Sequence, residues 1–299
     1  MKFVQTGSFK KDYLDEPMKF NPKERVHDIL LKKLDYLLGF VAKEKPEIIT
    51  DYVNNLITKY QGFVEKTILN DLSEVDEKLF IEYQNFNKYP DMKKVSLNYF
   101  IHLLQLKDKA DWEGTEVEIT TRANIEAWTF PSYYLLQTLT ETIEREDAIK
   151  LYKKYITNFY LDNPSPDRAK FVSLKKRYED RTSGDTSSSP WVLVHTMLED
   201  GKYAFKNKNC PTCVDSMKDL PDVELKYYTS CYRDYAAFKS YTHDSIILTM
   251  EHTLMQGDPY CSRVMHDTRI DYDLRHPPKE FWNNLEPGNE KEAKKYYKK

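Results

Sequence analysis

The sequence predicts an α+β protein in which a helical N-terminal region precedes an antiparallel sheet. Three observations favour this fold class. Apolar residues recur with helical spacing up to about residue 180, they alternate as in strands from residue 191 onward, and a polar stretch separates the two patterns. We therefore expect a helical region over residues 1–182, a linker over 183–190, an α+β domain over 191–270 and a polar tail over 271–299.

The helices of the N-terminal region begin at recognisable signals. Asn21 is expected to cap a helix that starts at Pro22, and Glu24 completes a pattern similar to a capping box. Pro46 opens a second helix, and a clear amphipathic pattern extends over residues 144–160. Further helical segments are expected over residues 63–72 and 93–106, a turn over 111–114 and an aromatic-rich segment over 122–139.

The C-terminal part has the predicted element order β-β-α-α-β-β, which suits an antiparallel sheet with helices on one face. A hairpin turn at Asp200 and Gly201 joins the first two strands. The strands are expected over residues 191–198, 203–205, 245–255 and 260–268, and the helices over 213–220 and 222–241. The tail after Arg275 is polar and is expected at the surface.

The composition argues against several classes of partner. A formal net charge of −3 and a pI near 6.2, without a basic block, give no reason to expect nucleic-acid binding. No apolar run reaches the roughly 18 residues of a membrane helix, and the N-terminus lacks the apolar core of a signal peptide, so we expect a cytoplasmic protein without membrane partners. The chain has only 8 glycines and contains neither common phosphate-loop motif.

All four cysteines lie between Cys210 and Cys261, which places any thiol chemistry in the C-terminal third. Cys210 and Cys213 form a C-x-x-C pair that, with Cys231 and Cys261, could hold zinc or iron. The spacings match no common zinc ribbon, however. Two disulfides are a further alternative, although a reducing compartment favours free thiols, metal ligands or catalytic cysteines.

The predicted helix over residues 222–241 carries an unusual polar pair. Tyr227, Cys231 and Asp234 share one face of this helix, with aromatic residues beside them. A carboxylate on an aromatic stripe costs free energy unless something pairs with it. The pair is either a thiol and a carboxylate facing a pocket, or an aspartate at the rim bonded to backbone or to an arginine.

Two histidines lie on apolar strand faces. His252 continues the alternation of Ile246 and Leu248, and His195 shares a face with Trp191 and Leu193. A histidine in such a position is a candidate base or ligand. The alternative is a core histidine whose two nitrogens are hydrogen-bonded.

Three short motifs together resemble the L-2-amino-thiazoline-4-carboxylic acid hydrolase family. They are a cysteine after the first hairpin (Cys210 or Cys213), Cys231-x-x-Asp234 on a helix, and Gly257-Asp258-x-x-Cys261 before the last strand. The segment over residues 139–152 also looks like that family's helix before the sheet. The resemblance extends over roughly residues 135–270.

The resemblance implies hydrolytic opening of a cyclic amidine-like C–N bond, as in the conversion of 2-aminothiazoline carboxylate to a carbamoyl-cysteine. A cysteine thiolate would attack the amidine carbon, or a cysteine-bound metal would activate water. The candidate catalytic residues are Cys231, Asp234, Cys261 and His252, and the candidate substrate contacts are Arg233, Arg263, Tyr227 and His195.

Two other function classes stay open at this point. The sheet-with-helices layout also resembles 4-vinyl reductase-like ligand-binding domains, so the chain could be a metal- or small-ligand-binding sensor or carrier. It could also be a structural or interaction protein with its cysteines in the core. Whether the chain is an enzyme or a carrier, its expected partner is a small molecule. The aromatic-rich helical region is a candidate substrate lid or homodimer face.

Overall fold

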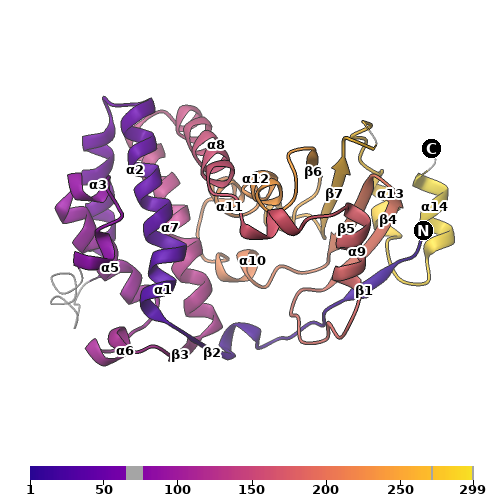
Figure 1. The fold of residues 1–299 in the computed structure, drawn as a ribbon, viewed down its shortest axis with the longest axis horizontal. Helices are drawn as coiled ribbons and strands as arrows, with labels where there is room; N and C mark the ends of the chain where they lie inside the picture. Colours follow the sequence, from indigo (N-terminus) through magenta and orange to yellow (C-terminus); the bar gives the residue numbers. More distant parts are fainter. Residues whose placement is uncertain (65–76, 271, 298–299) are drawn as a thin grey trace. The chain divides into compact units, whose positions relative to one another are not determined.

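The computed structural model describes residues 1–64, 77–270 and 272–297 (Figure 1). The chain forms two compact units. We call Leu14–Tyr155 the helical unit, and Met1–Tyr13 together with Ile156–Lys299 the sheet unit. The mixed α+β class with an antiparallel sheet is confirmed. Most of the predicted helix over 63–72 lies outside the described residues, and no helix among the described residues is long and apolar enough to span a membrane.

The helical unit consists of packed helices and one small hairpin. Its elements are the strands β2 (Pro17–Phe20) and β3 (Val117–Thr120), the α-helices α1 (Pro22–Val26), α2 (Lys32–Glu44), α3 (Ile49–Phe63), α5 (Pro90–Leu103), α6 (Lys109–Glu113) and α7 (Thr121–Thr142), the short π-helix η2 (His27–Leu31), and the 3-10 turns η1 (Tyr13–Asp15), η3 (Glu77–Phe80) and η4 (Phe86–Lys88). The boundary between the units falls within α8 (Arg145–Asp162). Figure 1 shows α3, α5 and α7 side by side, in mutual contact.

The start of α1 is built as the sequence predicts. The Asn21 side chain accepts hydrogen bonds from the backbone N–H groups of Lys23 and Glu24, and Pro22 is the first helical residue. The predicted turn over 111–114 is wrong, because α6 forms there. An Asp108 cap begins this helix, and Trp112 is fully buried beneath it.

The sheet unit contains an antiparallel sheet whose strand order in the described residues is β1-β4-β5-β7-β6. The strands are β1 (Val4–Thr6), β4 (Leu193–Glu199), β5 (Lys202–Asn207), β6 (Ile246–Met250) and β7 (Cys261–Asp267). The predicted hairpin between β4 and β5 is confirmed. The edge strand β1 was not predicted. It pairs with β4 and so brings the N-terminus into the sheet unit, which is why this unit begins at Met1.

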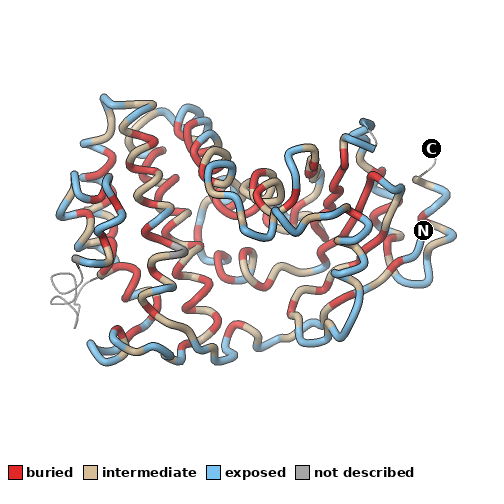
Figure 2. The backbone as a smooth tube through the Cα atoms, viewed as in Figure 1, coloured by how far each residue is buried: buried red, intermediate tan, exposed pale blue. Residues whose placement is uncertain are grey.

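Helices pack on both faces of this sheet, rather than on one face as predicted. One face bears α9 (Leu174–Thr182), which follows η5 (Pro166–Lys170), and α12 (Asp234–Ser240), and the other bears α13 (Lys279–Asn283) and α14 (Glu290–Tyr297). The short helices α10 (Cys213–Ser216) and α11 (Val223–Ser230) contact the 3-10 helix η6 (Leu254–Gln256). Alternate strand residues serve the two faces. Tyr203 and Met265 pack on the α9 side, whereas Ala204 and Val264 pack on the α13 side. Figure 2 shows β5 and β7 as continuous buried strands between these layers.

Two predicted elements end earlier than expected. The predicted helix over 222–241 is broken, because the N–H groups of Cys231 and Tyr232 both bond to the Tyr227 carbonyl and a turn follows before α12. The predicted strand over 245–255 ends at Met250, where β6 stops and the chain turns into the 3-10 helix η6 (Leu254–Gln256).

The segment predicted as a polar surface tail contributes to the core instead. Phe281, Trp282 and Leu285 are fully buried in the cluster that also holds Val194 and Val264 of the sheet. The Trp282 indole N–H donates to the Pro277 carbonyl at 2.9 Å. The few large apolar residues of this segment therefore decide its packing, although most of its residues are polar.

We expect Trp282→Ala to lower the free energy of unfolding by about 3–5 kcal/mol, because it empties a fully buried site. The matched control is Tyr272→Ala, since Tyr272 is 85% exposed in the same C-terminal segment. This control should change stability by no more than about 0.5 kcal/mol. Chemical denaturation measures both, and equal effects of the two substitutions would contradict the packing of α13 on the sheet.

Candidate functional site

The centre of the site is a buried ion pair on the α9 side of the sheet. Arg263 lies on β7, where Phe205 of β5 and Met250 of β6 are its strand neighbours. Its Nη2 atom donates to Asp234 Oδ2 at 2.8 Å, and its Nε atom donates to the Met250 sulfur at 3.3 Å. Only 8% of Arg263 is exposed. The pairing therefore compensates a charge that would otherwise be costly to bury.

Three of the cysteine thiols influence the pKa of this guanidinium. Burial opposes the charge of Arg263, but Asp234 and then the thiols of Cys261, Cys231 and Cys210 raise its pKa. The guanidinium thus stays cationic. In return, burial raises the pKa of Cys261, while the charge of Arg263 and the Leu254 N–H group lower it. The pKa of Cys261 is therefore raised overall, and Arg263 and the Leu254 N–H group are the two neighbours that stabilise its deprotonated form.

The predicted Gly257-Asp258-x-x-Cys261 motif builds the turn that supplies one of these neighbours. Gly257 has φ +93° at the end of η6, a conformation that favours glycine. Asp258 Oδ2 accepts the Thr253 N–H at 2.8 Å, and the adjacent Leu254 N–H donates to Cys261 Sγ at 3.2 Å. The motif therefore aims a backbone donor at the thiol.

His252 lies in the same turn but not on the predicted strand face. Because β6 ends at Met250, the strand alternation does not reach His252. Its Nδ1 is 3.4 Å from Asp258 Oδ1, and its ring meets that of Tyr260 edge to face. None of the described contacts of His252 involves Asp234.

The other three cysteines lie earlier in the chain than β7. Cys231 lies in the turn between α11 and α12, where burial raises its pKa and Arg263 lowers it. Cys213 begins α10, and a hydrogen bond with Cys210 followed by burial raises its pKa, whereas Arg233 lowers it. The four cysteines are free thiols.

The Cys210–Cys213 pair does not extend to a metal-ligand set. Within residues 1–64, 77–270 and 272–297, no three His, Cys, Asp or Glu side chains are grouped so that they could hold an ion. Zinc sites use three or four protein ligands. The described residues therefore do not fit the zinc or iron site that the cysteine spacing left open.

Two predicted substrate contacts have internal partners. His195 is hydrogen-bonded through Nε2 to Thr6 Oγ1 at 2.8 Å and through Nδ1 to Tyr203 Oη at 2.6 Å. Burial, assisted by Arg181, lowers the pKa of His195 to about 4. This geometry matches the alternative interpretation of a hydrogen-bonded core histidine. For Tyr227, burial and then Tyr235 raise the pKa of the hydroxyl.

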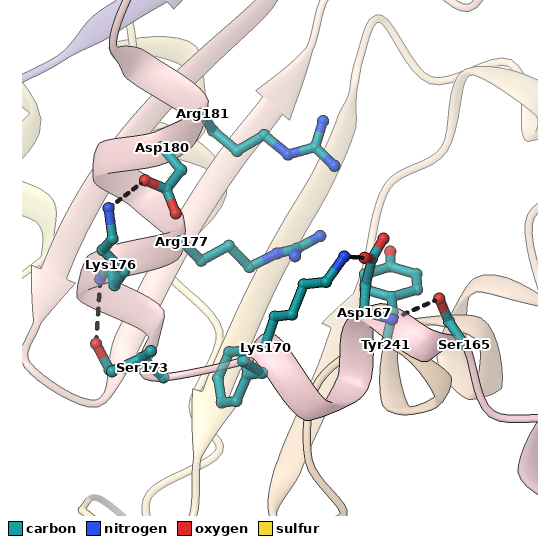
Figure 3. A pocket seen from close by; sticks show the side chains of 11 residues that line it. Ser165, Asp167, Lys170, Ser173, Lys176, Arg177, Asp180, Arg181 and Tyr241 are labelled. Carbon is teal, nitrogen blue, oxygen red and sulfur yellow. Dashed lines mark hydrogen bonds and ion pairs between the residues drawn. The ribbon is translucent and has the colours of Figure 1, made fainter.

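A cavity of about 440 Å³ on the same side of the sheet was not predicted (Figure 3). Charged residues of η5, the following loop and α9 line it, together with Tyr241. They are Asp167, Lys170, Lys176, Arg177, Asp180 and Arg181. The i,i+4 spacing of Arg177 and Arg181 was the sequence signal for a two-arginine helix face. Burial raises the pKa of Tyr241, and the charge of Arg177 lowers it.

Comparison with known proteins identifies the part of the chain that carries these residues. Residues 122–264 are similar to the L-2-amino-thiazoline-4-carboxylic acid hydrolase family. This confirms the resemblance stated from the short motifs. The matched segment includes the cysteines, the Asp234–Arg263 pair and the two arginines of α9. No curated protein and no solved structure matches the chain.

We expect Asp234→Asn to destabilise the protein by about 3–5 kcal/mol, because it leaves the buried Arg263 charge uncompensated. Asp244→Asn is the matched control, since it breaks the Arg168–Asp244 ion pair, in which the aspartate side chain is 71% exposed. The control should cost no more than about 1 kcal/mol. Similar losses in chemical denaturation would argue against a buried, structurally required pair.

His195 predicts a pH dependence of stability. Its folded pKa of about 4 lies below the ordinary value of 6.5, so the unfolded chain binds the proton more readily. The stability contributed by neutral His195 is complete above about pH 6.5 and is lost as the pH falls toward 4, by about 3 kcal/mol in total.

The measurement is the free energy of unfolding across this pH range. His195→Gln should flatten the slope between pH 6.5 and 4, whereas His243→Gln, which changes an exposed histidine, should not. An unchanged slope in the His195 variant would contradict the assignment.

Proposed function

We propose that the chain hydrolyses a cyclic amidine-like C–N bond in a small heterocycle, with 2-aminothiazoline-4-carboxylate as the reference substrate. One observation carries the proposal. Two segments that are distant in sequence, Cys231–Asp234 and Cys261–Arg263, meet where Arg263 Nη2 donates to Asp234 Oδ2 at 2.8 Å, and the thiols of Cys261, Cys231 and Cys210 help to raise the pKa of Arg263. These are the segments whose motifs resemble the hydrolase family, and they lie within the similar region.

The contacts favour Cys261 as the nucleophile. Its sulfur accepts the Leu254 N–H, and Arg263 lies two residues further along the same strand face. Both groups lower the pKa of this thiol, although burial keeps that pKa above its ordinary value. Within the described residues, Cys231 has no corresponding backbone donor. Its sulfur lies 3.6 Å from Ser230 Oγ, and burial raises its pKa strongly.

The reaction proceeds by addition and ring opening. The Cys261 thiolate adds to the amidine carbon, and the ring C–N bond breaks as the ring nitrogen takes up a proton. Water then replaces the Cys261 sulfur on that carbon, while the ring sulfur stays attached. In the net reaction the water oxygen ends on the carbon and its two protons end on the ring nitrogen. Arg263 stabilises the thiolate, and Asp234 is a positioning residue that holds the guanidinium. His252, paired with Asp258, is the candidate for moving the protons.

A second candidate function is binding without catalysis. The residues that line the 440 Å³ cavity include charged groups and Tyr241 but none of the cysteines. Such a cavity would suit a carrier or sensor of a small acid. Turnover therefore separates the two candidates, since a carrier binds the heterocycle and leaves it intact.

We expect Cys261→Ser to lower kcat for 2-aminothiazoline-4-carboxylate by about 10³-fold or more, because a hydroxyl is a far weaker nucleophile than a thiolate. Cys210→Ser and Cys231→Ser are the comparison variants and should lose much less. The measurement is steady-state formation of the ring-opened product. A larger loss in the Cys231 variant than in the Cys261 variant would reassign the nucleophile.

A further inference from the structure

The residues that line the cavity beside α9 carry more positive than negative charge. Lys170 is paired with Asp167 at 2.8 Å, and Lys176 is paired with Asp180 at 2.5 Å. The lining therefore has four cations and two carboxylates, which leaves a net charge of two positive units. Arg177 and Arg181 are the cations that remain, and within the described parts of the chain neither forms an ion pair.

The two arginines are directed into the same space. They are one helical turn apart on α9, and Figure 3 shows both guanidinium groups extending from the same side of the helix. The Arg177 guanidinium lies 4.7 Å from the centre of the Tyr241 ring and 6.0 Å from that of Phe238. These aromatic faces hold the side chain in place without neutralising it.

Bringing the two guanidinium groups together costs free energy in the absence of an anion. Burial lowers the pKa of Arg177, Tyr241 opposes this, and the charge of Arg181 lowers it further. An anion between the groups would relieve this repulsion and accept charge-assisted hydrogen bonds from both.

We propose that Arg177 and Arg181 form the binding site for the carboxylate of a small organic acid in this cavity. The site is separate from the thiols, because none of the cysteines belongs to the cavity lining, and the inference therefore goes beyond the hydrolysis proposed above. The two arginines replace the sequence-based candidate Arg263 as carboxylate-binding residues, because the Arg263 guanidinium is already engaged by Asp234 and Met250. The volume of about 440 Å³ lies in the range of small-molecule sites, roughly 300–1,000 Å³.

The charge balance favours a carboxylate over a phosphate. The Asp167 and Asp180 carboxylates belong to the same lining and repel a dianion more than a monoanion. A planar carboxylate also matches the fork of a guanidinium. Inorganic phosphate is therefore the competing anion in the test.

The test measures binding of thiazolidine-4-carboxylate by calorimetry. This probe has the ring and the carboxylate but no amidine carbon, so its binding does not depend on hydrolysis. Arg177→Gln and Arg181→Gln should each weaken binding by about tenfold to hundredfold, the loss expected for a charge-assisted hydrogen bond. Lys175→Gln, an exposed cation on the same helix outside the cavity lining, should leave binding unchanged.

The outcomes separate this inference from the proposed function. Equal binding by all three variants, equal binding of the methyl ester, tighter binding of inorganic phosphate, or no binding of the carboxylate up to about 10 mM would each overturn the carboxylate site. Arginine-dependent binding without turnover of 2-aminothiazoline-4-carboxylate would support the site and reject the hydrolase. Because Arg181 is exposed on α9, its variant tests the site even if the Arg177 variant is unstable.

Discussion

The Asp234–Arg263 ion pair is the interaction on which the arrangement of the sheet unit depends. A guanidinium on the interior strand β7 is compensated by a carboxylate from α12 that meets it at 2.8 Å. This pairing fixes how α12 packs on the sheet. It also places the turn between α11 and α12, and with it Cys231, close to the strand that begins with Cys261. The same pair thus organises both the packing and the chemistry of this face.

The two faces of the sheet have different roles. On the α13 side, Phe281 and Trp282 cover an apolar surface and contribute stability. On the α9 side, three polar side chains have identified partners. His195 is bonded at both nitrogens, Arg263 is bonded to Asp234, and Cys261 accepts a backbone N–H. Stability and reactivity are therefore separated by the alternation of side chains along the strands.

Local signals in the sequence predicted the local structure well. The Asn21 cap, the hairpin at Gly201 and the turn at Gly257 each depend on residues a few positions apart, and each is present. The suspicion that Asp234 requires a partner also follows from its neighbours alone. Its partner, Arg263, is 29 residues away and could be identified only from the strand register.

Features that depend on tertiary packing were missed. The three-residue strand β1 is too short to show a strand period, and its role comes from pairing with the distant strand β4, where Val4 lies opposite His195. The Phe281–Trp282 pair is hidden in a polar segment, although burial of two large rings outweighs the surrounding charges. Arg177 and Arg181 look like an ordinary solvated helix face until the cavity beside them is known.

The central claim is that Cys261, activated by Arg263 and the Leu254 N–H, attacks the amidine carbon. The most direct measurement is acid quenching of the enzyme during turnover of 2-aminothiazoline-4-carboxylate, followed by peptide mass mapping of the four cysteines. The account predicts a substrate-derived adduct on the peptide containing Cys261, and none on the peptide containing Cys231. Turnover with the adduct on Cys231, or with no adduct on any cysteine peptide, would contradict it.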